Sequence, residues 1–190
     1  YDRDLTSDPI RRLHQEDFCQ ALGLAADKKY QQEGGPTVAQ CANLLRSCTP
    51  IPAQELPRLV RAVAFSWIVG NCDAHGKNYS LLYDRGAPTL APLYDIVSTA
   101  VYSELTTRLA MSIDGARDLD YVDWRSWAKL ADEADLRPAF VTKTVGDLLR
   151  RAALEAPVLV ETGDHDNATA RQVTERVQRL ADRFAVTDAR

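Results

Sequence analysis

Apolar residues recur along most of this chain at the spacing of a helix. Val38, Cys41 and Leu45 share one helical face, directly after Gly34-Gly35-Pro36, which signals a turn and a helix start. The same periodicity predicts four more helices, namely one from Pro57 to about Gly70, one over Trp124–Glu133, one through Phe140–Ala152 and one through Val173–Phe184. The helix from Pro57 has apolar residues on a second side too, so we expect it to be central and buried all round.

One region in the middle of the chain departs from the helical pattern. Tyr79–Tyr83 is strand-like, Asp84-Arg85-Gly86 is typical of a turn, and Thr89–Leu93 returns as a second strand. Arg108–Ile113 is a third extended piece. No repeat or linker-like stretch interrupts the chain. We therefore predict a mainly α fold with a small β-hairpin, in which residues 1–190 form a single domain.

Composition narrows the class of protein without identifying it. Of the 190 residues, 45% are hydrophobic and 26% are charged, as in an ordinary soluble globular protein. No apolar run is long enough to span a bilayer, and the net charge of −4 gives no basic footprint for nucleic acid. We expect a cytoplasmic protein that contacts neither membrane nor nucleic acid directly. The four cysteines form no C-x-x-C pair, so reduced, buried thiols are expected.

The candidate chemistry lies on both sides of the hairpin. The helix that ends near Gly70 is followed by a polar loop with Asp73 and Asn78 five residues apart, and the return strand ends at Asp95. Protein-kinase active sites use this order of helix, loop, β-ribbon and second aspartate. Phosphoryl transfer needs a carboxylate at the attacking hydroxyl and oxygen ligands that hold Mg²⁺. Asp73 suits the first task, whereas Asn78 and Asp95 suit the second.

Each of these residues also has a purely structural explanation. Asp73 could cap a turn after the helix, Asn78 could occupy a turn position, and His75 alone would more often be structural. Asp95 is harder to explain in this way, because the apolar residues of Leu93–Val97 predict a core environment. A carboxylate among core residues must be paired or bind a metal. The combination favours the catalytic interpretation.

Five blocks of the sequence carry a resemblance to a known family. They are Gln15-Glu16-Asp17-Phe18-Cys19-Gln20-Ala21-Leu22-Gly23, Lys29-Tyr30, Gly34-Gly35-Pro36, the loop Asp73–Asn78, and Leu93–Ser98. In order and near-matching spacing they resemble the HipA family, the bacterial toxin kinases of type II toxin–antitoxin systems. The resemblance runs from Tyr1 to about Leu154 and is weak from Ala156 onward. Related kinases share the Asp…Asn spacing but not the Gln-Glu-Asp-Phe block.

The resemblance implies the helical C-terminal lobe of a protein-kinase-like fold that uses ATP and Mg²⁺. Asp73 matches the catalytic base, and Asn78 and Asp95 match the Mg²⁺ ligands. His75 matches a family histidine beside the phosphates and the base, where it positions groups rather than relaying protons.

Three further regions match places near the nucleotide in the family. Tyr1 and Asp2 resemble the end of the segment that links the two lobes and contacts adenine. Gln15 falls in a block beside the nucleotide cleft, although the helix expected around it could equally be structural. Lys77 lies in the catalytic loop, where a phosphate contact is an open alternative.

The family also suggests partners. Its members phosphorylate protein serine or threonine, with aminoacyl-tRNA synthetases as the known substrate class, and a small HipB-like DNA-binding antitoxin restrains them. The sequence has no glycine-rich phosphate loop, because its nine glycines are scattered. We therefore expect a piece of a longer kinase that lacks the N-terminal lobe and is inactive in isolation, with a natural stand-alone protein as the alternative.

Two other functions remain open at this stage. One is a degenerate kinase lobe that binds an antitoxin or another partner without catalysis, and the retained Asp73, Asn78 and Asp95 argue against it. The other is a small-molecule or lipid kinase, since the D-x-H-x-x-N loop occurs there too. The Gln-Glu-Asp-Phe block favours the protein kinase.

Overall fold

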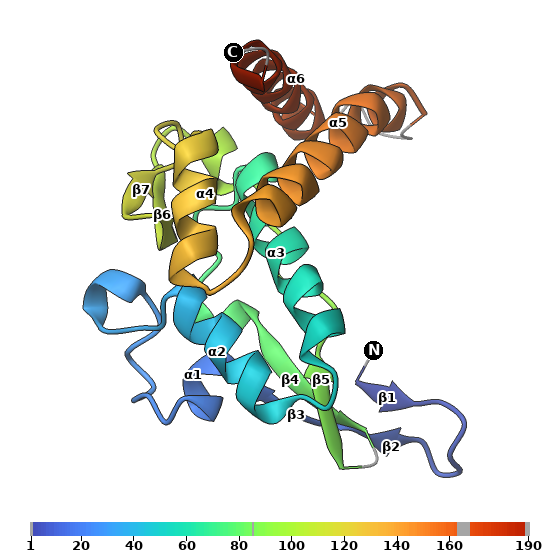
Figure 1. The fold of residues 1–190 in the computed structure, drawn as a ribbon. Coiled ribbons are helices and arrows are strands. Elements are labelled where there is room, and N and C mark those ends of the chain that lie inside the picture. The colour runs from blue at the N-terminus through green and yellow to red at the C-terminus, as the bar shows by residue number, and fades with distance from the viewer. Residues whose placement is uncertain (1, 85, 163–167, 189–190) are drawn as a thin grey trace.

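The computed structural model describes residues 2–84, 86–162 and 168–188, and it is mainly helical, as the apolar periodicity predicts (Figure 1). Its α-helices are α1 (Phe18–Ala21), α2 (Val38–Cys48), α3 (Pro52–Val69), α4 (Trp124–Glu133), α5 (Pro138–Thr162) and α6 (Ala168–Asp188). Three short 3₁₀ helices connect them, η1 (Gln31–Glu33), η2 (Gly76–Asn78) and η3 (Thr99–Val101). None of the described helices is long and apolar enough to cross a membrane.

The strands of the described residues form three small antiparallel sheets. The three-stranded sheet has the order β3-β4-β5, from β3 (His14–Asp17), β4 (Ser80–Asp84) and β5 (Ala87–Leu90). The others pair β1 (Arg3–Asp4) with β2 (Arg11–Arg12), and β6 (Arg108–Ile113) with β7 (Ala116–Asp118). In the first sheet, Asp17 lies opposite Ser80 and Leu81 opposite Leu90. A segment near the N-terminus is thereby joined to the predicted hairpin.

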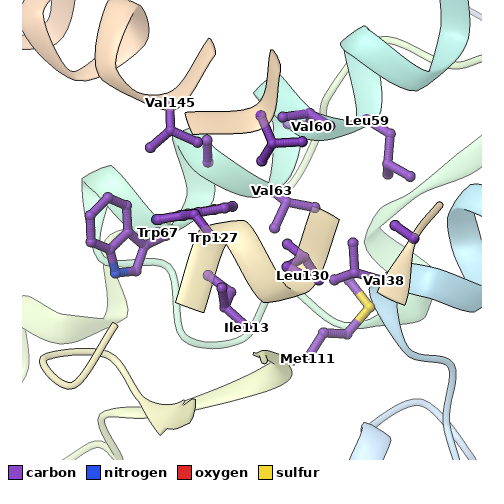
Figure 2. Packing of buried hydrophobic residues seen from close by; sticks show 14 of the residues in the cluster. Val38, Leu59, Val60, Val63, Trp67, Met111, Ile113, Trp127, Leu130 and Val145 are labelled. Atoms are coloured by element: carbon purple, nitrogen blue, oxygen red, sulfur yellow. The ribbon is translucent and has the colours of Figure 1, made fainter. Parts of the chain in front are cut away.

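The core is built around α3, which runs from the sheet to α5 and α6 in Figure 1. Figure 2 shows Trp67 and Val63 of α3 packed among residues of α4, α5 and β6. The ring centroids of Trp67 and Trp127 lie 5.5 Å apart at an interplanar angle of 73°, an edge-to-face geometry that aromatic rings favour. The ring centroid of Phe184 in α6 lies 5.1 Å from the ring centroid of Trp67. The expected central position of this helix is confirmed, but α3 is not buried all round, because Arg61 is exposed and Phe65 and Val69 on its second apolar side are only half-buried.

The helix boundaries follow their capping residues. Thr37 caps α2, because its side chain accepts a hydrogen bond from the backbone N–H of Gln40. Asp123 caps α4 in the same way, so the predicted Trp124–Glu133 helix is confirmed at both ends. α3 begins five residues earlier than expected, at Pro52 rather than Pro57. Proline is favoured in the first turn, and Pro57 is accommodated inside the helix.

Three expectations about the region around the hairpin are wrong. Gln15 lies on β3 and not on a helix, because this strand pairs with β4. The return strand ends at Leu90, so Asp95 lies in an irregular segment beyond it rather than at the strand end. Leu93, Ile96 and Val97 are 37–47% exposed and not part of the core.

The cysteines agree with expectation. All four are free, and Cys19, Cys41 and Cys72 are buried while Cys48 is half-buried. Burial raises the pKa of each thiol, which keeps the reactive thiolate form scarce at neutral pH.

Candidate active site

The polar loop begins directly after the C-terminal end of α3. Gly70 caps the helix with a φ of 78°, a left-handed conformation that glycine adopts without a steric penalty. Arg176 of α6 donates a hydrogen bond to the carbonyl oxygen of Trp67 at 3.1 Å, which satisfies one of the last helical acceptors. The loop then turns through η2 into β4. Its start is therefore fixed by both α3 and α6.

The segment that carries Asp95 is tied to the same helix end. Asp95 has a φ of 56°, in the left-handed region that residues other than glycine rarely adopt. The Asn71 side chain donates to the backbone oxygen of Asp95 at 3.2 Å, and the Ser98 hydroxyl donates to the backbone oxygen of Val69 at 2.6 Å. These contacts place the Asp95 segment against the polar loop without any strand pairing.

Asn78 and Asp95 are in direct contact. The Asn78 amide Nδ2 donates to the carboxylate oxygen Oδ2 of Asp95 at 2.6 Å, across seventeen positions of sequence. The Asn78 carbonyl oxygen accepts the backbone N–H of His75 at 3.0 Å, so the amide is held at both ends. Asn78 is buried, whereas the Asp95 carboxylate is exposed to solvent. The structure therefore brings the two predicted metal ligands together.

Asp73 is connected to this pair through one intermediate side chain. Its backbone N–H donates to Asn71 Oδ1 at 3.1 Å, and the same Asn71 side chain binds the Asp95 backbone. The Asp73 carboxylate is exposed and accepts the phenolic hydroxyl of Tyr30 at 2.8 Å on Oδ1. Asp73 is thus linked to Asp95 through one asparagine.

The side chain of His75, which belongs to the same loop, is buried. The Tyr30 ring meets its imidazole edge-on, with centroids 5.3 Å apart. Burial lowers the pKa of His75 below its usual value, and the nearby Asp73 carboxylate opposes this effect. The imidazole is therefore neutral at pH 7. Within the described residues its Nδ1 has no hydrogen-bond partner, which leaves a buried polar atom available at the site.

Gln15 and Lys77 both contact the frame of the loop. Gln15 donates to the Ser80 hydroxyl at 3.0 Å, and Ser80 bonds to the Tyr94 hydroxyl at 2.6 Å. Tyr94 in turn donates to the Lys77 backbone oxygen. The Lys77 ammonium donates to the backbone oxygen of Ala26 at 2.6 Å. Gln15 is thus connected to the site through side chains.

Asp2, one of the two N-terminal candidates, is not brought to this cluster. Asp2 pairs with Arg3 at 2.7 Å and with Arg12 at 3.2 Å, and its backbone oxygen accepts the N–H of Leu13. These contacts belong to the β1–β2 hairpin. Tyr1 lies outside the described residues.

The donor set fits magnesium in its chemistry. Mg²⁺ prefers oxygen ligands, often one or two carboxylates completed by water and phosphate oxygens. Asp95 offers an exposed carboxylate, and the Asn78 carbonyl oxygen keeps a second lone pair beyond the one that His75 uses. No three histidine, cysteine, aspartate or glutamate side chains gather into a metal cluster in the ranges that the structure covers. Water and phosphate oxygens would therefore complete the coordination.

Sequence reasoning missed two residues of the site. Asn71 connects Asp73 with Asp95, and Tyr30 holds the Asp73 carboxylate. Asn71 begins the polar loop, and Tyr30 belongs to one of the blocks that carry the family resemblance. The Tyr30 contact could not be predicted, because Tyr30 lies 43 positions from Asp73 in sequence.

A helical lobe with an aspartate loop, a β-ribbon and an asparagine–aspartate pair defines a kinase-like protein, and comparison with known proteins agrees. The family model of the HipA-like C-terminal domain matches residues 1–156. The chain belongs to this family, as the sequence blocks predicted.

Two relatives and one solved structure illustrate the match. The chain is 43% identical over 166 residues to "Putative kinase Y4mE" of Sinorhizobium fredii, covering 86% of this chain and 40% of that protein. It is 28% identical over 175 residues to the "Serine/threonine-protein kinase toxin HipA" of Shewanella oneidensis, covering 84% of this chain and 40% of that protein. A solved complex of HipA, HipB and operator DNA from Shewanella oneidensis matches with a TM-score of 0.82 and 26% identity, over 97% of this chain and 46% of that chain. The chain thus spans less than half the length of these relatives.

Proposed function

We propose that this chain is the catalytic-loop and magnesium-binding lobe of an ATP-dependent serine/threonine protein kinase of the HipA toxin type. The observation that carries the proposal is the 2.6 Å contact between Asn78 and Asp95. It unites the two oxygen-bearing side chains from opposite sides of the hairpin, next to the loop that carries Asp73. A cap or a turn would require no such contact.

Asp73 would act on the acceptor. Its carboxylate is exposed and held on one oxygen by Tyr30, so the other oxygen can meet a serine or threonine hydroxyl. As the acceptor oxygen bonds to the γ-phosphorus of ATP, the bond from that phosphorus to ADP breaks. Asp73 then takes the hydroxyl proton.

Asp95 and Asn78 would hold Mg²⁺, which when bound neutralises charge on the transferring phosphates. Neutral His75, buried behind the loop, would position the loop and the phosphates rather than relay protons. Gln15 would support the nucleotide side of the site through Ser80. We assign nucleotide contacts to Tyr1, Asp2 and Lys77 from the family resemblance alone.

The partners follow from the relatives. Because the Shewanella oneidensis HipA complex contains HipB and operator DNA, we propose a HipB-like DNA-binding antitoxin as the partner of this protein. The acceptor would be a protein hydroxyl, and the family resemblance points to aminoacyl-tRNA synthetases.

Three variants of the full-length protein that contains this chain test the proposal. Asp73→Asn keeps the side-chain shape and removes the base. It should lower the phosphotransfer rate by about a hundredfold or more while Mg-ATP binding stays near wild type. Asp95→Asn weakens a charged metal ligand, so Mg-dependent nucleotide binding and rate should fall together. Asn78→Ala should resemble Asp95→Asn more mildly, because a neutral ligand binds Mg²⁺ less strongly.

Calorimetric titration with Mg-ATP and a radiolabelled phosphotransfer assay measure the two quantities. Asp132→Asn, an exposed carboxylate on α4, is the control and should behave as wild type. Wild-type transfer rates in both Asp73→Asn and Asp95→Asn would place the site elsewhere. Loss of nucleotide binding in Asp73→Asn alone would reverse the two assignments.

A further inference from the structure

A cavity of about 390 Å³ opens beside Asp73, within the volume range of small-molecule and side-chain pockets. It lies between η1 and the chain that leads from η3 into β6. Of the three proposed catalytic and metal-binding side chains, only Asp73 lines it, whereas Asn78 and Asp95 do not. The cavity therefore lies on one side of Asp73, and the proposed metal ligands lie on another.

The walls of this cavity are mainly apolar. Leu105, Leu109 and Cys72 line it, and Leu105 is 48% exposed. A leucine that is half open to water at the edge of a cavity gains free energy when another apolar side chain covers it. The exposed side chains of Glu33 and Arg108 add opposite charges. Such a surface suits a bound segment in which an apolar side chain is flanked by polar or charged residues.

A hydroxyl already binds Asp73 here. Tyr30, which also lines the cavity, donates its phenolic hydroxyl to Asp73 Oδ1 at 2.8 Å. Among the described residues, no hydrogen bond reaches the other carboxylate oxygen, Oδ2. A second hydroxyl can therefore bind the same carboxylate without displacing Tyr30.

Resting on the function proposed above, we propose that this cavity binds the acceptor segment of the protein substrate and selects an aliphatic residue next to the phosphorylated serine or threonine. The acceptor hydroxyl binds Asp73 Oδ2, and the neighbouring aliphatic side chain packs against Leu105 and Leu109. Glu33 and Arg108 can pair with charges of opposite sign further along the substrate. The hydroxyl of a polar small molecule such as a free sugar would lack this neighbouring aliphatic group, so it would leave the apolar walls without a selective role.

Peptide selectivity in the full-length protein tests the cavity. Peptides with one serine flanked by leucine, alanine or lysine, on either side in turn, should differ in kcat/KM. Leucine should exceed alanine by about tenfold or more, the scale for filling an apolar pocket. Leu105→Asp should abolish that preference and favour lysine instead, because the introduced carboxylate attracts the ammonium group. Since each ratio compares two peptides on one enzyme preparation, partial loss of folded protein cancels.

Leu154→Asp provides the matched control. Leu154 is 76% exposed on α5, outside the residues that line the cavity, so its variant should keep the wild-type preference for leucine. Binding of a fluorescent peptide with alanine in place of serine, measured by anisotropy, reports the same preference without phosphoryl transfer.

The outcomes separate this inference from the proposed function. Transfer to every peptide at equal kcat/KM, with Leu105→Asp indistinguishable from wild type, would overturn the cavity assignment and leave the kinase standing. Selective peptide binding without transfer or Mg-dependent nucleotide binding would support the cavity and contradict the kinase. Transfer only to free sugars or lipids would overturn both the cavity assignment and the protein substrate.

Discussion

Tyr30 connects three features of the site at the scale of single residues. Its hydroxyl holds the Asp73 carboxylate, its ring packs edge-on against His75, and the Lys29 ammonium lies 4.7 Å from its ring centroid. A carboxylate on an exposed loop would otherwise sample several rotamers. The phenol therefore fixes the direction in which the proposed base points.

Tyr30→Phe removes this hydroxyl and keeps the ring. In the full-length protein we expect kcat to fall by roughly tenfold, because one charge-assisted hydrogen bond that orients the base is lost. The KM for Mg-ATP should change little, since Tyr30 contacts neither Asn78 nor Asp95. Steady-state kinetics measures both. Tyr121→Phe, a tyrosine that is 79% exposed, is the control, and an unchanged kcat in Tyr30→Phe would show that Asp73 needs no such orientation.

Residue types and spacing could predict which side chains belong to the site, but not all of their surroundings. Asn78 and Asp95 meet as expected, but hydrogen bonds from Asn71 and Ser98 hold the Asp95 segment there, because the return strand already ends at Leu90. The expected core environment of Asp95 is wrong, since Leu93, Ile96 and Val97 are partly exposed. A run of apolar letters in an irregular segment has no period, so it does not indicate which side chains face inward.

Gly76 shows how neighbouring elements hold the catalytic loop. A Cβ atom on this residue would lie 2.4 Å from Pro36 Cγ and 2.8 Å from the sulfur of Cys19. Its backbone N–H donates to the Lys29 carbonyl oxygen at 3.3 Å. The start of η2 is therefore packed directly against the turn before α2, so a methyl group there would have to displace the loop.

Gly76→Ala should destabilise the protein by about 1–3 kcal/mol, the usual cost of overpacking a close contact. Urea unfolding followed by circular dichroism measures this change. Gly146→Ala is the matched control, because its Cβ would lie 3.3 Å from the Trp124 ring and alanine favours the α5 helix. An equal or larger loss of stability in Gly146→Ala would contradict this explanation.

Secondary elements were predictable where one local pattern decided them. α4 combines apolar periodicity with a capping aspartate, and both of its ends could be located from sequence. β3 could not, because its residues His14–Asp17 are all polar or charged and show no strand alternation. The strand exists because β4 pairs with it across more than sixty positions, a contact that carries no local signal.

At the scale of the whole molecule, the function proposed above means that the chain presents one side of a nucleotide site. It spans about 40% of the length of two curated relatives, and we expect the remaining length of a longer protein to cover the phosphates. The 190-residue chain alone should therefore bind Mg-ATP on the order of a hundredfold or more weaker than the full-length protein, because contacts that fix orientation are lost. Calorimetric titration of both proteins is the test. Equal affinities would show that this lobe alone forms the nucleotide site.

The contact of α6 with the end of α3 extends the folding unit beyond the part of the sequence that defines the family. The family model ends at residue 156, whereas the solved HipA complex matches 97% of the chain. Phe184 covers Trp67, and Arg176 binds the backbone one turn before the catalytic loop. A change in α6 can therefore shift the proposed catalytic loop from outside the residues that the family model matches. Boundaries drawn for truncation should follow this packing and keep the last helix.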